Sequence, residues 1–137
     1  MTTKLATMLV SGSLLLGIVP AWAHHSFAAE FDVNKTLKLR GTVTKMDWVN
    51  PHVWVHLDVK NADGSVVGWM IECGSPNALL RRGFNKSSLP VGTELFVEAF
   101  QAKDGTNLGN AQNVTLADGK RIFLGSSDEG AAPSPGK

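Results

Sequence analysis

A single cysteine, Cys73, is present among the 137 residues of the chain. One cysteine excludes an intrachain disulfide, and it also excludes a zinc site built on paired cysteines. The fold therefore has to be stabilised by the packing of apolar side chains. Because alternation places Cys73 on the same face as Trp69 and Ile71, we expect its thiol to be buried, unpaired and slow to react with thiol reagents.

The chain also lacks an excess of charge of either sign, with 13 basic and 12 acidic residues. Nucleic-acid-binding proteins carry a basic surface that meets the phosphates, and membrane-surface segments are polybasic. The balanced charge argues against both classes of partner. Common enzyme motifs are missing as well: there is no GxSxG, no phosphate-binding loop and no HExxH, and the carboxylates are scattered. We therefore predict that the protein is not an enzyme.

No apolar run is long enough for a comfortable membrane span. The run at residues 8–19 is short, with Lys4 ahead of it and Ala21-Trp22-Ala23 behind it. A weakly basic start, a short apolar run and small residues at a cleavage site are typical of a secretory signal peptide. We expect residues 1–23 to be removed on export to the periplasm, which leaves 12 basic and 12 acidic residues and no membrane span.

Alternating apolar and polar side chains predict the strands of the mature protein. One strand is expected at residues 37–44, where Gly41 suggests a bulge or a bend. A hairpin is expected from residues 52–59 and 66–73, with the turn at Ala62-Asp63-Gly64. If Asn61 pairs with Ser65, the large apolar side chains of both strands share one face, which includes Val55 and Leu57. Trp54 and His56 then lie on the other face, across from Glu72 and Met70.

The second half of the chain predicts a helix and two more strands. Ser75 is a good N-cap, Pro76 suits the first helical position, and Gly83 can end the helix after Arg82. Strands are expected at residues 93–100 and 113–116, and a last extended segment at 121–124. The order predicts a mainly β protein, a small five-stranded OB-like barrel with one short helix between strands 3 and 4. We expect an N-terminal arm at 24–36, the barrel at 37–124 and a disordered tail at 125–137.

Cleavage after Ala23 makes His24 the first residue of the mature chain. A free N-terminal histidine can chelate a metal through its amine and its imidazole, and His25 can do so through the amine, a deprotonated amide and its own imidazole. Nitrogen-rich sites of this kind suit Cu(II), which binds most tightly among the common divalent metals. We therefore predict copper binding by His24 and His25. The alternative is a solvated arm that begins with two histidines.

Two further histidines are candidates in the body of the fold. His52 and His56 lie on the same face of one strand, but their separation is about 13 Å, so one ion is not expected to join them. His56 lies opposite Met70, a soft donor suited to Cu(I), and we expect these two residues to complete the copper site. Trp54 and His52 are the candidate ligand-binding residues, because an exposed tryptophan on an OB-type barrel can stack a sugar or a base.

Four segments of the sequence resemble a known family. They read HHSFAAEFD at the mature start, GTVTKMDWVNPHVWVHLDV in the first strands, GSPNALLRRGF at the helix and AKDGTNLGNAQNVTLADGKRIF near the end. With them the chain resembles small exported proteobacterial proteins of unknown function. The resemblance implies a periplasmic location and an OB-like β-barrel, and it brings no established activity.

The sequence thus favours an exported, non-enzymatic OB-like domain that binds copper through its mature N-terminus. The alternative is a binding module that uses the face of Trp54 for a small molecule, a glycan or a protein partner. An oxidative copper enzyme is less favoured, because the chain is small and no substrate platform can be identified in it.

Overall fold

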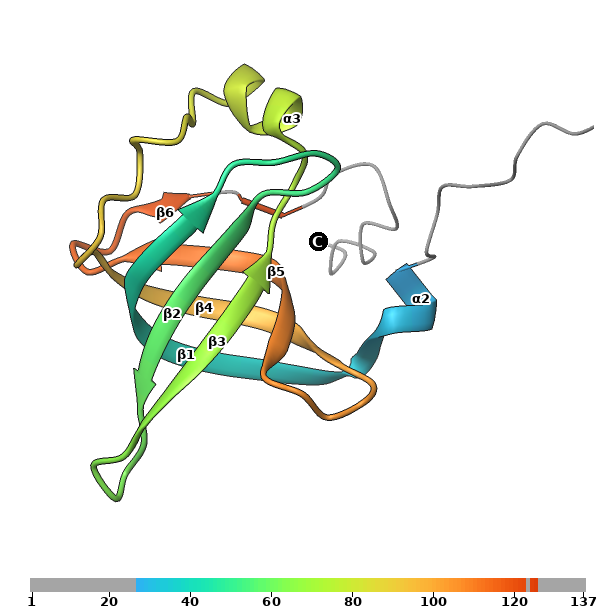
Figure 1. The fold of residues 1–137 in the computed structure, drawn as a ribbon, viewed down its shortest axis with the longest axis vertical. Coiled ribbons are helices and arrows are strands. Elements are labelled where there is room, and N and C mark those ends of the chain that lie inside the picture. Colours follow the sequence, from blue (N-terminus) through green and yellow to red (C-terminus); the bar gives the residue numbers. More distant parts are fainter. Residues whose placement is uncertain (1–26, 123, 126–137) are drawn as a thin grey trace, which may run out of the picture.

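The computed structural model describes residues 27–122 and 124–125; the predicted signal peptide, His24, His25 and nearly all of the predicted tail lie outside this part of the chain. The described residues form two short helices and six strands (Figure 1). In chain order they are α2 (Phe27–Glu30), β1 (Phe31–Asp47), β2 (Trp54–Lys60), β3 (Val66–Glu72), α3 (Pro76–Arg81), β4 (Glu94–Ala102), β5 (Leu108–Leu116) and β6 (Arg121–Ile122). None of the helices there is long and apolar enough to cross a membrane.

All six strands belong to one sheet, with the order β3-β2-β1-β4-β5-β6. Neighbours in this order are antiparallel. A further, parallel pairing joins β3 to β5, and it closes β1, β2, β3, β5 and β4 into a five-strand ring (Figure 1). The protein is therefore mainly β, as predicted, with a ring of five strands and β6 attached to β5.

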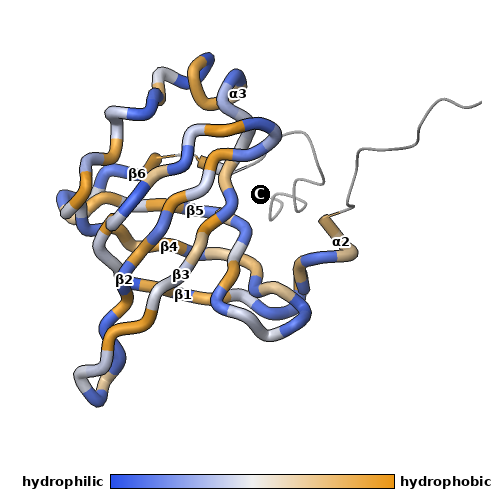
Figure 2. The backbone as a smooth tube through the Cα atoms, viewed as in Figure 1, coloured by the Kyte–Doolittle hydropathy of each residue, from blue (hydrophilic) through white to orange (hydrophobic). Residues whose placement is uncertain are grey.

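The core lies inside the five-strand ring. Hydrophobic and hydrophilic residues alternate along β2 (Figure 2), and exposed and less exposed positions alternate along β3 from Val66 to Ile71, so each strand turns one apolar face inward. Full burial of each large apolar side chain contributes about 1.5–3 kcal/mol. The buried residues of this core are Val43, Val53, Val55, Leu57, Val59, Ile71, Cys73, Leu79, Leu89, Leu95, Val97, Ala99, Ala111, Val114, Ile122 and Leu124.

The predicted hairpin and helix are confirmed. In the β2–β3 register Val55 pairs with Ile71, Leu57 with Trp69 and Val59 with Val67, and the Asn61 N–H donates to the Ser65 carbonyl over 2.8 Å. Val55 and Leu57 are buried, whereas Trp54 and His56 lie on the other face. The Ser75 hydroxyl caps α3 by accepting from the Ala78 N–H, and Gly83 follows the helix with a φ of 84°.

Two strands are longer than predicted. β1 begins at Phe31 instead of residue 37, so residues 31–36, expected in the arm, are part of the sheet. β5 begins at Leu108 instead of residue 113. In both places the backbone finds a partner far away in the sequence: Thr36 pairs with Phe100, and Leu108 with Met70. Pairing between such distant segments is not visible in the local sequence, and in β1 it is also irregular between Asp32 and Thr36.

Gly41 allows close approach of two strands and is not itself a bulge. A side chain there would place its Cβ 3.1 Å from the Leu57 Cβ and 3.1 Å from the Asp58 carbonyl oxygen. The irregularity in the β1–β2 register lies two residues later, between Val43 and Lys45. It allows β1 to bend and to pair with β4 along its first part and with β2 along its second.

A second, smaller core fixes α2 against the sheet. The Phe27 ring stacks on Phe31 at 5.6 Å and meets the edge of Phe100 at 5.3 Å between ring centroids. The backbone N–H of Lys103 donates to the Glu30 carbonyl over 2.8 Å, and its ammonium group donates to the carbonyl of Ala28. Phe27 and Phe31 therefore attach the start of the described chain to the body.

Candidate functional site

The outer face of β2 and β3, away from the core, carries the candidate residues Trp54, His56 and Met70 in two cross-strand rows. We call this surface the β2–β3 outer face. Facing positions in a sheet bring side chains on one face close together. The first row reads Asp47, Trp54, Glu72 and Asn110 across β1, β2, β3 and β5; the second reads Lys45, His56, Met70 and Leu108 across the same strands.

His56 is held by a carboxylate from β1. Its Nε2 lies 2.8 Å from the Asp47 Oδ2, and the other carboxylate oxygen accepts from the Lys45 ammonium over 2.7 Å. The hydrogen bond from Lys45, followed by that from His56, holds the pKa of Asp47 below its usual value. Because an ionised carboxylate only accepts, the His56 Nε2 carries a proton. In the neutral ring Nδ1 is then the atom able to bind a metal.

His52 is oriented the other way round. Its Nδ1 lies 3.1 Å from the carbonyl oxygen of Cys73, which can only accept, so Nδ1 carries the proton. Its Nε2 lies 3.4 Å from the Glu72 Oε1. Glu72 is only 6% exposed and, with Asn110, is one of two buried polar side chains in the described part of the protein. His56 on β2 and His52, just before β2, therefore differ in the ring nitrogen that carries the proton, which is Nε2 in His56 and Nδ1 in His52.

Cys73 lies on the core side of the same strand end. It is fully buried and its thiol donates to the Ile71 carbonyl at 3.6 Å. Burial, reinforced by the nearby charge of Glu72, raises the pKa of the Cys73 thiol to about 12. A protonated, buried thiol is a poor nucleophile and a poor metal ligand, and the predicted burial is confirmed.

The predicted site residues are therefore brought together only in part. His56 and Met70 face one another in the register, and Met70 is 39% exposed. Trp54 is half-buried and lies on β2 between His52 and His56. His24 and His25 lie outside the described residues. Within those residues, no three histidine, cysteine or acidic side chains are grouped closely enough to hold a metal.

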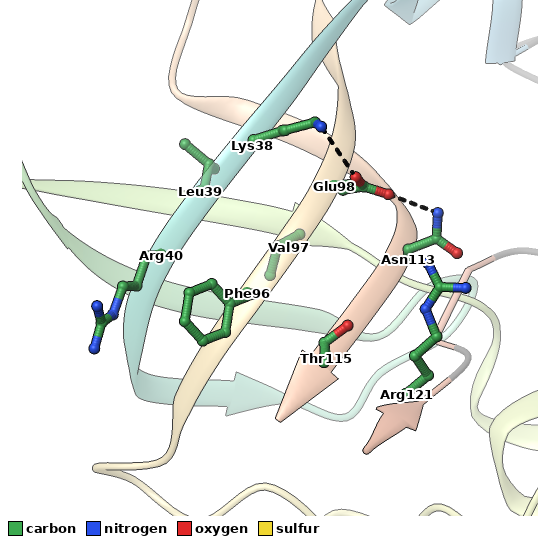
Figure 3. A pocket seen from close by; sticks show the side chains of 9 residues that line it. All are labelled: Lys38, Leu39, Arg40, Phe96, Val97, Glu98, Asn113, Thr115 and Arg121. Atoms are coloured by element: carbon green, nitrogen blue, oxygen red, sulfur yellow. Dashed lines mark hydrogen bonds and ion pairs between the residues drawn. The ribbon is translucent and has the colours of Figure 1, made fainter. Parts of the chain in front are cut away.

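A second candidate lies on another side of the ring, where the outer faces of β1, β4 and β5 form a hollow of about 290 Å³. Figure 3 shows Phe96 at its centre, in a cross-strand row that reads Arg40, Phe96, Thr115 and Arg121. Phe96 is 41% exposed, and the guanidinium of Arg40 lies 5.2 Å from the centroid of its ring. The hollow includes neither Trp54 nor His52.

The polar groups of this hollow are partly satisfied by one another. Glu98 accepts from Asn113 at 2.8 Å and pairs with Lys38 at 3.6 Å (Figure 3), while Arg40 donates to Glu94. Arg121 makes no ion pair with the described residues. The sequence contains an indication of this hollow, because strand alternation over residues 93–100 places Phe96 on the polar face with Glu94 and Glu98.

These features define a small β-rich domain with polar clusters on its outer faces. Comparison with known protein families identifies its family. The model of a family of unknown function, DUF6152, matches residues 12–112, and the chain belongs to that family. No curated protein and no solved structure matches the chain.

Proposed function

We propose that this protein is an exported domain that binds copper on the β2–β3 outer face, through His56 and Met70 together with the mature N-terminal residues His24 and His25. The single observation that carries the proposal is the contact between the His56 Nε2 and the Asp47 Oδ2 at 2.8 Å. Histidines that bind metals usually donate their other ring N–H to a carboxylate or a carbonyl, which fixes the tautomer and strengthens the ligand.

Met70 supplies the second donor. It lies directly across the sheet from His56 and exposes 39% of its surface, although apolar side chains of its size are commonly buried. A thioether is a soft ligand that favours Cu(I), whereas imidazole and amine nitrogens suit Cu(II). A site with both kinds of donor binds copper in either oxidation state, which suits a carrier.

The N-terminal part of the site depends on processing. Cleavage after Ala23 gives His24 a free amine, and one added residue would convert that amine into an amide and remove it as a ligand. The basic start, the apolar run at residues 8–19 and the small residues of Ala21-Trp22-Ala23 support export to the periplasm. Phe27 anchors the chain three residues after His24.

The fold we propose for this function is an OB-like barrel. Its support is the closed pairing of β1, β2, β3, β5 and β4, with the helix α3 between β3 and β4. The face formed by strands 2 and 3 is a common binding surface in OB folds. Fold analogy does not establish function, so the copper proposal stands on the donor set alone.

The test is a competitive copper titration of the protein purified after export, with its first residue read by mass spectrometry. We expect one copper ion per chain and a loss of affinity of at least about tenfold in a form with one extra residue before His24. His24→Ala should weaken binding, and His25→Ala should change the paramagnetic resonance spectrum if the second-position amide takes part.

The matched control uses the two histidines of the body. His56→Ala should change the Cu(II) spectrum and Met70→Ala should weaken Cu(I) binding, whereas His52→Ala should leave both unchanged. Equal affinities and identical spectra for the processed and extended forms would rule out the copper site.

A second candidate function, a binding module, is favoured by the hollow at Phe96. An exposed aromatic ring flanked by Arg40 and Arg121 suits a small planar molecule with a negative charge, through stacking and cation contacts. Nuclear magnetic resonance titration with small aromatic carboxylates should then shift the amides of β4 and β5, and Phe96→Ala should abolish the shift. Trp54→Ala is the control, because Trp54 lies outside the hollow.

A further inference from the structure

We propose that one edge of β3 pairs with the same edge of a second copy of the chain, which joins two molecules through one continuous sheet. On one side β3 has β2 along its whole length, but on the other side β5 accompanies only Met70, Ile71 and Glu72. Among the residues that the structure describes, none pairs with this second side of Val66–Trp69. We call Val66–Trp69 the open β3 edge, and it contains none of the proposed copper ligands.

The peptide groups of two residues on this edge point away from β2. The Asn61 N–H donates to the Ser65 carbonyl over 2.8 Å, which makes these residues a hydrogen-bonded pair. Such pairs alternate along an antiparallel ladder, so Val66 and Gly68 turn their N–H and C=O groups outward. The Met70 N–H lies on the same side and donates to a carbonyl of the loop before β5 over 3.0 Å. Val66 and Gly68 thus each offer one donor and one acceptor to a further strand.

The side chains of the open β3 edge fit a copy of themselves. Val66 and Gly68 lie on the same face; Val66 is 59% exposed, whereas a Cβ at Gly68 would meet no atom within 4 Å. In an antiparallel pair centred on Val67, Val66 of each molecule lies opposite Gly68 of the other and fills the space beside that glycine. The same register pairs the outward N–H and C=O groups of both residues. The contact is therefore self-complementary, as a two-fold interface requires.

Charge distinguishes the open β3 edge from the second open edge of the sheet. β1 pairs with β4 from Phe31 onwards but with β2 only from Gly41, so one side of residues 33–40 is open as well. That stretch carries Lys35, Lys38 and Arg40, and charged side chains on an edge strand oppose the addition of another strand. Residues 65–71, in contrast, include no charged residue and no proline. The open β3 edge lacks these two protections, so two copies can approach without repulsion.

The position of the hairpin makes the edge accessible. Figure 1 shows the turn between β2 and β3 projecting beyond the rest of the ring. On the face opposite Val66, the two copies of Val67 meet at the two-fold axis, and Trp69 of each molecule lies opposite Ser65 of the other. Because only a few residues of each copy take part, the contact is small, and we expect a dimer that forms reversibly at high concentration.

Hydrogen exchange of the exported protein, measured by nuclear magnetic resonance at about 50 µM and about 1 mM, tests the pairing. We expect the amides of Val66 and Gly68 to exchange at least about threefold more slowly at the higher concentration, because only the second copy protects them. The amides of Val67 and Trp69 face β2, so their exchange should not depend on concentration. Equal exchange of Val66 and Gly68 at both concentrations, with only monomer in sedimentation velocity, would overturn the proposal.

Two substitutions act on the edge itself. Val66→Lys places a charge there and should raise the dissociation constant of the dimer by at least about tenfold. Gly68→Pro removes an outward N–H that β2 does not use, and it should have the same effect. The matched control is Val91→Lys, because Val91 is 73% exposed in the loop before β4 and the dimer should tolerate the change. A dimer weakened equally by both lysine substitutions would contradict pairing at this edge.

A cysteine at the two-fold axis tests the register. Val67→Cys would face its own copy in a non-hydrogen-bonded pair, with about 4.5 Å between the Cα atoms, which a disulfide can span. Ser65→Cys is the control, because it would lie about 13 Å from its copy along the strands. Mild oxidation should therefore link the Val67→Cys protein alone, since Cys73 is buried. Equal linkage of both variants, or protected Val66 and Gly68 amides in a protein that stays monomeric, would overturn the dimer.

Discussion

On the β2–β3 outer face, a neighbouring group determines which ring nitrogen of each histidine carries the proton. The Asp47 carboxylate fixes Nε2 of His56, and the Cys73 carbonyl fixes Nδ1 of His52. The sequence predicted that both histidines share a face, because side chains alternate along a strand. It did not predict which nitrogen each one presents, because Asp47 reaches His56 from β1 through a register that shifts between Val43 and Lys45.

Cys73 gives a residue-scale prediction for alkaline stability. Its pKa is raised from 9.0 to about 12 in the folded protein, so the folded thiol keeps a proton that the unfolded chain releases. The free energy of unfolding should therefore fall as the pH rises from 9.0 towards 12, by about 1.4 kcal/mol per pH unit. Urea unfolding at a series of pH values measures this slope.

The control for that prediction is Cys73→Ala, which lacks the titrating group. Because lysines also titrate in this range, the informative quantity is the difference between the two slopes. Below pH 9.0 the difference in stability between the two proteins should be constant. A difference that stays constant above it as well would contradict the prediction.

At the scale of elements, strands that alternate could be predicted and strands that depend on distant partners could not. The β2–β3 hairpin and α3 carry local signals, namely apolar alternation, a Gly64 turn and the Ser75 cap. In the first part of β1 the alternation stops after Asn34, and both this part and the start of β5 depend on pairing with distant residues, such as Thr36 with Phe100 and Leu108 with Met70. The hollow at Phe96 was missed for a related reason, since four strands have to assemble before Arg40 and Arg121 share a row.

Gly41 tests the close approach of β1 and β2. The Cβ of any side chain there would meet Leu57 and Val59 atoms at 3.1 Å, so Gly41→Val should overpack the hairpin and destabilise the protein by about 1–3 kcal/mol. Gly68→Val is the matched control, because no atom lies within 4 Å of a Cβ at that position. Valine favours strands, so the control should be neutral or slightly stabilising. Equal destabilisation by both substitutions in thermal unfolding would contradict the steric explanation.

The whole molecule depends on a short closing contact. Only three residue pairs join β3 to β5: Met70 with Leu108, Ile71 with Gly109, and Glu72 with Asn110. Without them the same strands would form an open sheet with two long edges. This contact also places Asn110 and Glu72 at facing positions, so closure of the ring and assembly of the outer polar row are the same event.

Gly109→Val should crowd β5 against Ala99 of β4, directly beside this closing contact. The new Cβ would lie 3.0 Å from the Ala99 Cβ and 3.5 Å from the Ile71 Cδ1, both in the core. We expect a loss of about 1–3 kcal/mol of stability. We also expect faster hydrogen exchange in residues 70–72 and 108–110 than in the β1–β2 pairing. Uniform acceleration of exchange across all strands would instead indicate that closure is not a separable step.

The long strand β1 has a consequence for the order in which the chain can become stable. One edge of β1 pairs with β2, which follows it closely, and the other with β4, which ends at Ala102. Because synthesis proceeds from the N-terminus, β1, β2 and β3 are complete before β4 and β5 exist to cover their apolar face. Loop-closure entropy also delays contacts between distant segments. We therefore expect the apolar face of β1, β2 and β3 to be covered only after the residues of β4 and β5 have been added.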